Sequence, residues 1–221
     1  MKELGEMLIE SLEKRGAIAM LNDDRRAAVV RAAGELLDSN IAMRALQVGE
    51  AMPDFTLHAA TDQLVRLSEV LPAAQPWSAS SGVPGASIAS PSSVHSPTRT
   101  IRSAQPVPEV LALSPQREEL EGTRALPFPW LRDDDNLVAR KVGVAFELPR
   151  DLSWAYRELG IDLPKLNQSD RFELPVPATF VVGKDQRIRF AHVEPDYRRR
   201  PTVHEVLRAV EEATKTSELF R

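Results

Sequence analysis

The sequence contains no cysteine among its 221 residues. A chain without cysteine forms no disulfide, binds no metal through thiolate sulfur and carries out no thiol chemistry of its own. This absence limits the possible functions more than any residue that is present.

Long apolar runs and an excess of positive charge are also missing. No run approaches the roughly 18–20 residues that span a bilayer, so no membrane partner is expected. The first sixteen residues, MKELGEMLIESLEKRG, are charged throughout and lack the apolar core of a signal peptide, which predicts a cytoplasmic protein. The formal net charge of −4 gives no reason to expect nucleic acid as a partner.

What is present is typical of globular chains. Hydrophobic residues make up 43% and charged residues 27% of the sequence, which is enough apolar material for a core. A chain of this length fits one domain with an extension, or two small domains.

A helical arm is predicted over residues 1–47. Its first helix carries Leu4, Met7, Leu8, Ile9 and Leu12 at helical spacing. A turn at 21–24, with an Asp as N-cap, precedes a second helix over about 25–37, and a shorter helical stretch follows over 41–46. The apolar stripes indicate an arm packed on its own domain or on a twin subunit; a groove for another partner is the alternative.

A second domain is predicted over residues 48–214, followed by a C-terminal tail over 215–221. Glycine and proline punctuate residues 48–55, and short strands are expected at 55–57 and 64–67 around a polar turn. Ser68 is then expected to cap a helical turn through Leu71.

Residues 72–108 differ from the sequence on both sides. They hold 9 serines and 7 prolines among 37 residues, no acid, and only Arg99 and Arg102 as bases. No helical or strand period persists there, so the composition predicts a linker or disorder and no central strand.

Alternating strands and helices are predicted again after Glu109. Strands are expected at 110–114, 178–182 and 188–192, the last two joined by a turn at 183–186. Helices are expected at 116–120, from the Asp133–Asp135 cap to Val142, at 151–159, and from a Thr202 cap to about Ala213. This order predicts an α/β sandwich, a central mixed sheet with flanking helices.

No residue receives a catalytic, cofactor-binding or metal-ligating role from these patterns, and no cofactor is expected. The histidines are His58, His95, His192 and His204, and their spacing matches no metal-binding motif. Ser114 lacks the sequence context of a hydrolase nucleophile.

Two charged runs allow a functional interpretation as well as a structural one. The Asp133–Asp135 run could suggest a cation loop, but it lacks the ligand alternation of a calcium loop, and helix capping is the preferred interpretation. The Arg198–Arg200 run could meet an anionic partner; a solvated loop is the preferred interpretation.

Several segments, in order, resemble the AhpC/TSA peroxiredoxins, which are thiol peroxidases of the thioredoxin fold. The matching segments are Val48–Leu57 with Leu67-Ser68, Val110–Gln116, Leu126–Leu131 with Asp133–Val142, Pro175–Val182, and Phe190–Tyr197. The likeness covers about residues 46–71 and 109–212. It implies a thioredoxin-like sandwich and a cis-proline at Pro177.

The resemblance also implies what should stand between its two blocks. In the family, a buried strand leads to a Trp-Cys-x-x-Cys turn at a helix N-terminus, where the thiolate is stabilised. This chain has the serine- and proline-rich stretch there, so the first core β–α unit is expected to be missing or disordered.

A frame shift is one explanation of that stretch. With suitable synonymous codons, residues 77–94 read in another frame as V-G-I-F-R-G-A-W-C-Q-Y-C-K-S-E-L-R, which restores a strand, two cysteines and a helix. A natural linker insertion is the alternative.

The resemblance implies a peroxiredoxin-like antioxidant protein, and the missing cysteine predicts that this chain is inactive. The alternatives are a non-catalytic binding or dimerisation module and the product of a damaged gene. A homodimer is compatible with the resemblance, and a thioredoxin-like reductant would be a partner only if a thiol were present.

Overall fold

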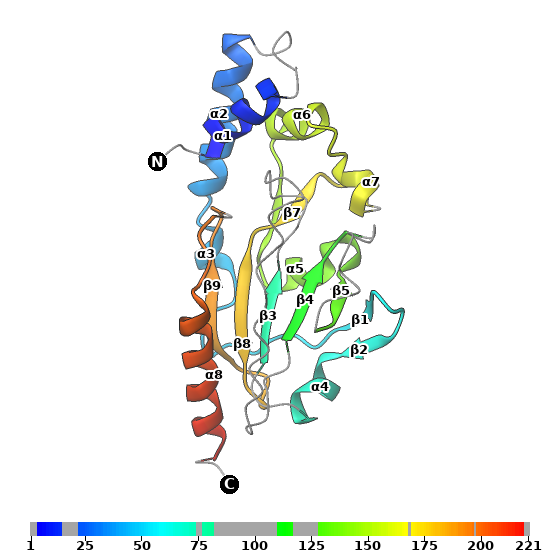
Figure 1. The fold of residues 1–221 in the computed structure, drawn as a ribbon, viewed down its shortest axis with the longest axis vertical. Coiled ribbons are helices and arrows are strands. Elements are labelled where there is room, and N and C mark those ends of the chain that lie inside the picture. The colour runs from blue at the N-terminus through cyan, green and yellow to red at the C-terminus, as the bar shows by residue number, and fades with distance from the viewer. Residues whose placement is uncertain are drawn as a thin grey trace.

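The computed structural model describes residues 4–14, 22–73, 77–81, 110–116, 128–167, 169–196 and 198–218. These residues form a seven-stranded mixed sheet with helices on both faces, and a helical region with a small two-stranded sheet at one end (Figure 1). The predicted α/β fold class is therefore confirmed. The predicted helix at 116–120 falls almost wholly outside the described residues.

The main sheet has the strand order β2-β1-β5-β4-β3-β8-β9. Strands β3, β4 and β5 run parallel to one another, and the remaining pairs are antiparallel. The strands are β1 (Thr56–Ala59), β2 (Leu64–Arg66), β3 (Trp77–Ser81), β4 (Val110–Ser114), β5 (Trp130–Arg132), β8 (Ala178–Val182) and β9 (Ile188–Val193).

The central position of β3 corrects one expectation. Composition predicted no strand within 72–108, yet Trp77–Ser81 pairs with β4 on one side and with β8 on the other. The five residues contain no proline, so each has a backbone N–H that can join a ladder. The rest of the predicted linker, residues 82–108, lies outside the described residues.

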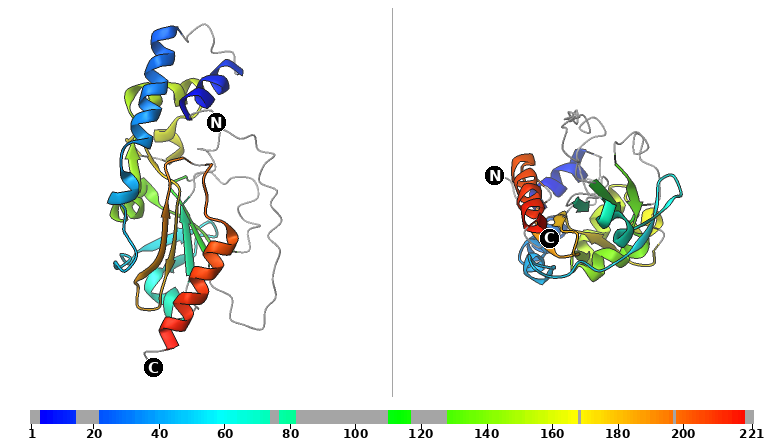
Figure 2. Two further views of the ribbon diagram at one scale, coloured as in Figure 1. Left: turned by 90° about the vertical axis from the view of Figure 1, so that its left-hand side faces the viewer. Right: turned by 90° about the horizontal axis from the view of Figure 1, so that it is seen from below.

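Strand β8 lies in the interior of the fold and is covered on both faces of the sheet. All five of its residues, ATFVV, are buried, as expected for a strand covered on both faces. Helix α8 (Val203–Glu218) covers one face, where Val206, Ala209 and Val210 pack against Val181. Figure 2 shows this helix lying along the sheet.

Helix α8 begins as predicted and ends later than predicted. The Thr202 hydroxyl accepts a hydrogen bond from the Glu205 N–H at 3.2 Å, and the Glu205 carboxylate accepts one from the Thr202 N–H at 2.7 Å. This reciprocal capping box fixes the start of the helix. The helix continues to Glu218, past the predicted end near Ala213.

The opposite face of the sheet carries the largest apolar cluster. Leu111, Leu131 and Phe180 are buried there against α5 (Leu137–Lys141), which follows a 3₁₀ turn at Asp134–Asn136. The other elements near the sheet are α3 (Ile41–Arg44) and α4 (Leu67–Ala73). Helix α4 begins one residue before the expected Ser68 cap.

The helical arm packs on its own domain, which confirms one of the two interpretations of its apolar stripes. Leu8, Leu12 and Val29 are buried against Leu152 and Leu159. The elements of this end are α1 (Leu4–Lys14), α2 (Asp23–Leu37), α6 (Arg150–Glu158), α7 (Leu163–Asn167), β6 (Ala145–Glu147) and β7 (Glu173–Pro175). Figure 1 shows α1, α2 and α6 at the top of the molecule, with α7 and β7 below them.

The cap of α2 is Asn22, whose side-chain oxygen accepts a hydrogen bond from the Arg25 N–H at 2.9 Å. The predicted Asp cap is therefore wrong: Asp23 and Asp24 form the first helical turn, where a negative charge favours the helix dipole. Strands β6 and β7 and helix α7 were not predicted, since each is only three to five residues long.

Candidate functional site

The parallel strands β3 and β4 end at the same edge of the sheet. Ser81, the last residue of β3, pairs with Leu113 on one side and with Ala178 on the other. Ser81 therefore lies between the residues that directly precede Ser114 and follow Pro177. The family resemblance places its thiol turn directly after this strand, and those residues lie outside the described part of the chain.

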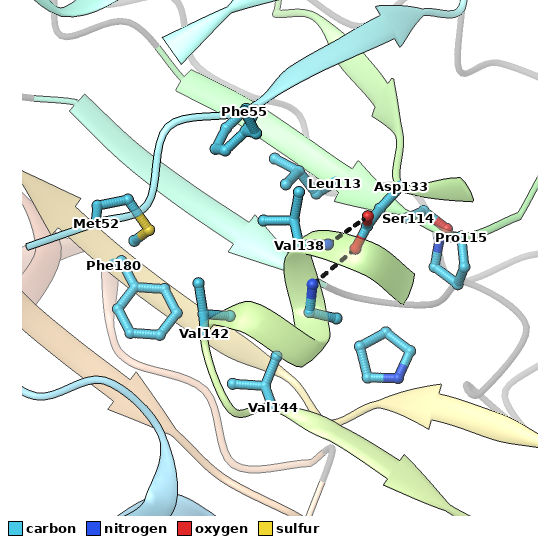
Figure 3. A pocket seen from close by; sticks show the side chains of 12 residues that line it. Met52, Phe55, Leu113, Ser114, Pro115, Asp133, Val138, Val142, Val144 and Phe180 are labelled. Carbon is cyan, nitrogen blue, oxygen red and sulfur yellow. Dashed lines mark hydrogen bonds between the residues drawn. The ribbon is translucent and has the colours of Figure 1, made fainter. Parts of the chain in front are cut away.

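A pocket lies beside this edge, between the sheet and α5 (Figure 3). Its empty space is about 440 Å³, including the part at its mouth that is open to solvent. The apolar lining comes from Met52, Phe55, Leu113, Pro115, Val138, Ala139, Val142, Val144, Pro175 and Phe180. Ser114 and Asp133 are the polar residues among the described lining residues.

Asp133 is buried, with 3% of its surface exposed, and it caps the short helix beside the pocket. Its two carboxylate oxygens accept hydrogen bonds from the N–H groups of Val138 and Ala139, each at 2.8 Å. Burial raises the pKa of Asp133, and these two hydrogen bonds oppose the rise. The capping interpretation of the Asp133–Asp135 run is confirmed for Asp133.

Ser114 joins the strand end to this cap. Its carbonyl oxygen accepts a hydrogen bond from the Asp133 N–H at 2.8 Å, and its hydroxyl oxygen accepts one from the Gln116 N–H at 3.2 Å. Ser114 is 1% exposed. Among the described residues no histidine lines the pocket, and both oxygens of the neighbouring Asp133 carboxylate already accept backbone hydrogen bonds.

A second polar cluster, which the sequence patterns did not indicate, ties α5 to β7. The Arg140 guanidinium forms ion pairs with Asp135 and Glu173, both at 2.7 Å. The Ser169 hydroxyl donates to Asp135 at 2.5 Å. Hydrogen bonds from Ser169 and Arg140 lower the pKa of Asp135. Every charge in this cluster has a partner, so the cluster positions elements and offers no reactive group.

The histidines lie on separate elements. Nδ1 of His58 on β1 is 3.4 Å from the Asp62 carbonyl oxygen, His192 lies on β9, and His204 lies on α8. Within the described ranges, no three or more His, Asp or Glu side chains are grouped so that they could hold a metal ion. His95 lies outside those ranges.

The arginine run at 198–200 is partly neutralised by nearby acids. Arg198 forms an ion pair with the buried Asp196 at 2.6 Å, and Arg199 lies 3.8 Å from both Asp196 and Glu194. The interpretation as a freely solvated loop is therefore too simple for Arg198 and Arg199.

Pro177 stands at the start of β8, where the family resemblance predicts a cis peptide bond. Every peptide bond in the described residues is trans, so this expectation is not met. The same residues contain no helix long and apolar enough to cross a bilayer.

Comparison with known proteins identifies the fold. No protein-family model and no curated protein matches the sequence. The mitochondrial 2-Cys peroxiredoxin from Plasmodium falciparum has a similar structure, with a TM-score of 0.53 and 15% identity over 79% of this chain and 98% of that chain.

Two further solved structures resemble the chain less. AhpC from Mycobacterium bovis gives a TM-score of 0.48 at 15% identity, covering 76% of this chain and 92% of that one. Peroxidoxin BcpB from Mycobacterium tuberculosis gives 0.45 at 15% identity, covering 76% and 97%. The chain therefore has a thioredoxin-like α/β fold, of the kind that the Plasmodium falciparum peroxiredoxin has.

Proposed function

We propose that this chain descends from thiol peroxidases of the peroxiredoxin type and does not itself reduce peroxides. One observation carries the proposal: a fold shared with a peroxiredoxin is built from a sequence that contains no cysteine. In a thiol peroxidase, the thiolate sulfur bonds to one peroxide oxygen, the O–O bond breaks, and the other oxygen leaves as water or an alcohol. The resulting sulfenic acid needs a second thiol to restore it.

No side chain among the described lining residues of the pocket can take the place of a cysteine thiolate. Serine has no polarisable anion near neutral pH, and the Asp133 carboxylate in the same wall already accepts backbone hydrogen bonds with both oxygens. Methionine, present here as Met52, is oxidised slowly and has no resolving partner in such a cycle.

The test measures consumption of hydrogen peroxide and of an alkyl hydroperoxide by the purified chain, with thioredoxin and its reductase as reductant. We expect rates equal to those of the buffer. Thiol-dependent turnover above the buffer rate would contradict the proposal.

A restored chain provides the matched control. Residues 77–94 are replaced by V-G-I-F-R-G-A-W-C-Q-Y-C-K-S-E-L-R, and a second version carries serine in place of both cysteines. Peroxide turnover that appears in the first version and disappears in the second would show that sulfur is what the natural chain lacks. Sequencing the gene across codons 70–109 tests the frame-shift origin directly.

A non-catalytic binding or dimerising module is the second candidate. It is favoured by the framework of the described residues: β3 is paired on both sides, and each face of the sheet carries a buried apolar cluster. Light scattering on the purified chain tests the proposed homodimer. A chain that aggregates or does not fold would instead support the third candidate, the product of a damaged gene.

We also propose that the protein is located in the cytoplasm. Fractionating the source cells tests this location.

A further inference from the structure

Arg198 connects the helical arm to the chain that follows the main sheet. Its Nη1 atom donates a hydrogen bond to the sulfur of Met7 on α1, at 3.2 Å, and joins segments 191 positions apart in the sequence. The buried Asp196 holds the same guanidinium in place, because its two carboxylate oxygens accept hydrogen bonds from Nε at 2.7 Å and from Nη2 at 2.6 Å. Figure 2 shows the chain between β9 and α8, which carries Arg198, reaching toward α1.

Met7 lies outside the apolar core of the arm. Its neighbours in the chain, Leu8 and Ile9, are buried in that core, and the described residues of the cluster do not include Met7. Met7 is half-buried and Arg198 is exposed, so their contact lies near the surface. A polar atom added to this sulfur is therefore placed beside a charged donor and not among core side chains.

The sulfur of a methionine reacts with hydroperoxides. A sulfur lone pair attacks one peroxide oxygen, the S–O bond forms and the O–O bond breaks. The proton of the transferred oxygen passes to the departing oxygen, which leaves as water or an alcohol. The thioether loses two electrons and the peroxide gains them. The product, methionine sulfoxide, is returned to methionine by methionine sulfoxide reductases.

Oxidation changes how strongly this position accepts a hydrogen bond. A thioether sulfur is a weak acceptor, whereas the oxygen of a sulfoxide is strongly polar. A guanidinium N–H bonded to such an oxygen makes a charge-assisted hydrogen bond, which is roughly twice as strong as one between neutral groups. Because Asp196 already fixes the guanidinium of Arg198, little side-chain freedom is lost when this bond forms.

We propose that Met7 is a site of reversible oxidation by hydroperoxides and that its sulfoxide fastens α1 to Arg198. Each chain takes up one oxygen atom at this sulfur and turns over only with a reductase. The inference goes beyond the proposed function, which concerns thiol-dependent turnover. The peroxidase assay and the experiment below therefore succeed or fail independently.

The test treats the full chain with hydrogen peroxide and locates the added oxygen by mass spectrometry of its peptides. Met7 should be oxidised at peroxide concentrations that leave Met52 reduced, because Met52 is 4% exposed. Hydrogen exchange of the α1 amides should then be about ten-fold slower, the fold-change equivalent to about 1.4 kcal/mol. Treatment with methionine sulfoxide reductases should restore the original exchange rate.

Variants separate Met7 from the other methionines and test its partner. Met43→Leu is the matched control: it removes the sulfur of a residue that is 72% exposed and should leave the peroxide effect unchanged, whereas Met7→Leu should abolish it. Met7→Gln supplies an amide oxygen as acceptor, so without peroxide its α1 amides should exchange more slowly than those of Met7→Leu. Arg198→Lys keeps the positive charge but lacks the planar set of donors, and it should reduce the effect of peroxide.

Three results would each overturn the proposal. The first is that Met7 stays reduced at peroxide concentrations that oxidise Met43. The second is that hydrogen exchange of α1 is unchanged or faster once Met7 is oxidised. The third is that the Met7→Leu chain responds to peroxide as the natural chain does.

Discussion

Gly5 on α1 lies directly against Val30 on α2: a Cβ atom added to Gly5 would stand 2.6 Å from the Val30 Cα. Real Cβ atoms do not approach backbone so closely, so only glycine permits this crossing of the two arm helices. The crossing places Leu8 and Leu12 of α1 in the buried cluster of the arm.

Gly5→Ala should therefore destabilise the arm, by about 1–3 kcal/mol, since one helix must move to relieve the overlap. Gly34→Ala is the matched control. It lies inside α2 with no atom within 4 Å of an added Cβ, so better helix propensity should stabilise the chain by up to about 1 kcal/mol. Urea unfolding measures both changes, and equal effects of the two substitutions would contradict the close crossing.

Arg140 should be needed to keep Glu173 buried. The side chain of Glu173 is only 10% exposed, and Arg140 contacts it at 2.7 Å. Arg140→Met removes the counter-charge and should cost about 3 kcal/mol of unfolding free energy. Glu173→Gln should cost less, because Arg140 then still has Asp135 as its counter-charge and no carboxylate is left unpaired.

The double variant Arg140→Met with Glu173→Gln supplies the control for this pair. Its cost should be clearly less than the sum of the two single costs, since the charge left unpaired by the first change is removed by the second. Strict additivity would mean that the ion pair contributes nothing to stability.

Asp196 should stabilise the fold in a pH-dependent way. Its hydrogen bonds from Arg198, the largest cause, lower the pKa of this buried carboxyl. A lowered folded-state pKa gives stability that is complete above the unfolded value of about 3.9 and is lost as the pH falls through the folded value. Asp196→Asn should thus cost about 1–2 kcal/mol at pH 7, with the difference from the natural chain shrinking below about pH 4.

Unfolding free energies measured from pH 7 to pH 2 check this prediction. Asp170→Asn, at an exposed position, controls for the change in net charge. A difference between the natural chain and Asp196→Asn that stays constant down to pH 2 would refute the assigned role.

Strand β3 should exchange its amide hydrogens slowly. Its backbone pairs with β4 and β8, and amides in a doubly paired central strand open only with large parts of the fold. Hydrogen exchange should show the amides of Ala79–Ser81 protected to a degree similar to those of β8. Exchange at the rate of an unstructured chain would instead favour the prediction from composition that residues 72–108 form a linker or are disordered.

Elements with strong local signals were predictable from the sequence. The Thr202–Glu205 capping box marks the start of α8, and Asp133 caps the helix that follows it. The turn at 183–186 joins β8 to β9. Each of these signals depends on residues only a few positions apart, so a short stretch of sequence is enough to recognise it.

Features set by distant residues were not predictable. Trp77–Ser81 has no strand-like composition, and its pairing is decided by backbone groups of β4 and β8. The pocket likewise brings Phe55, Leu113, Val142 and Phe180 together from four parts of the chain. Asn136, the last residue of the 3₁₀ turn, adopts a left-handed conformation with φ of 53° directly before α5, which no local pattern indicated.

The position of β3 also affects how the chain is made. The first of its two neighbours begins only at Val110 and the second only at Ala178. During synthesis on the ribosome, β3 therefore emerges long before either neighbour, and its backbone groups stay open to other nascent chains. Strand β3 can complete both of its ladders only after Ala178–Val182 has been translated.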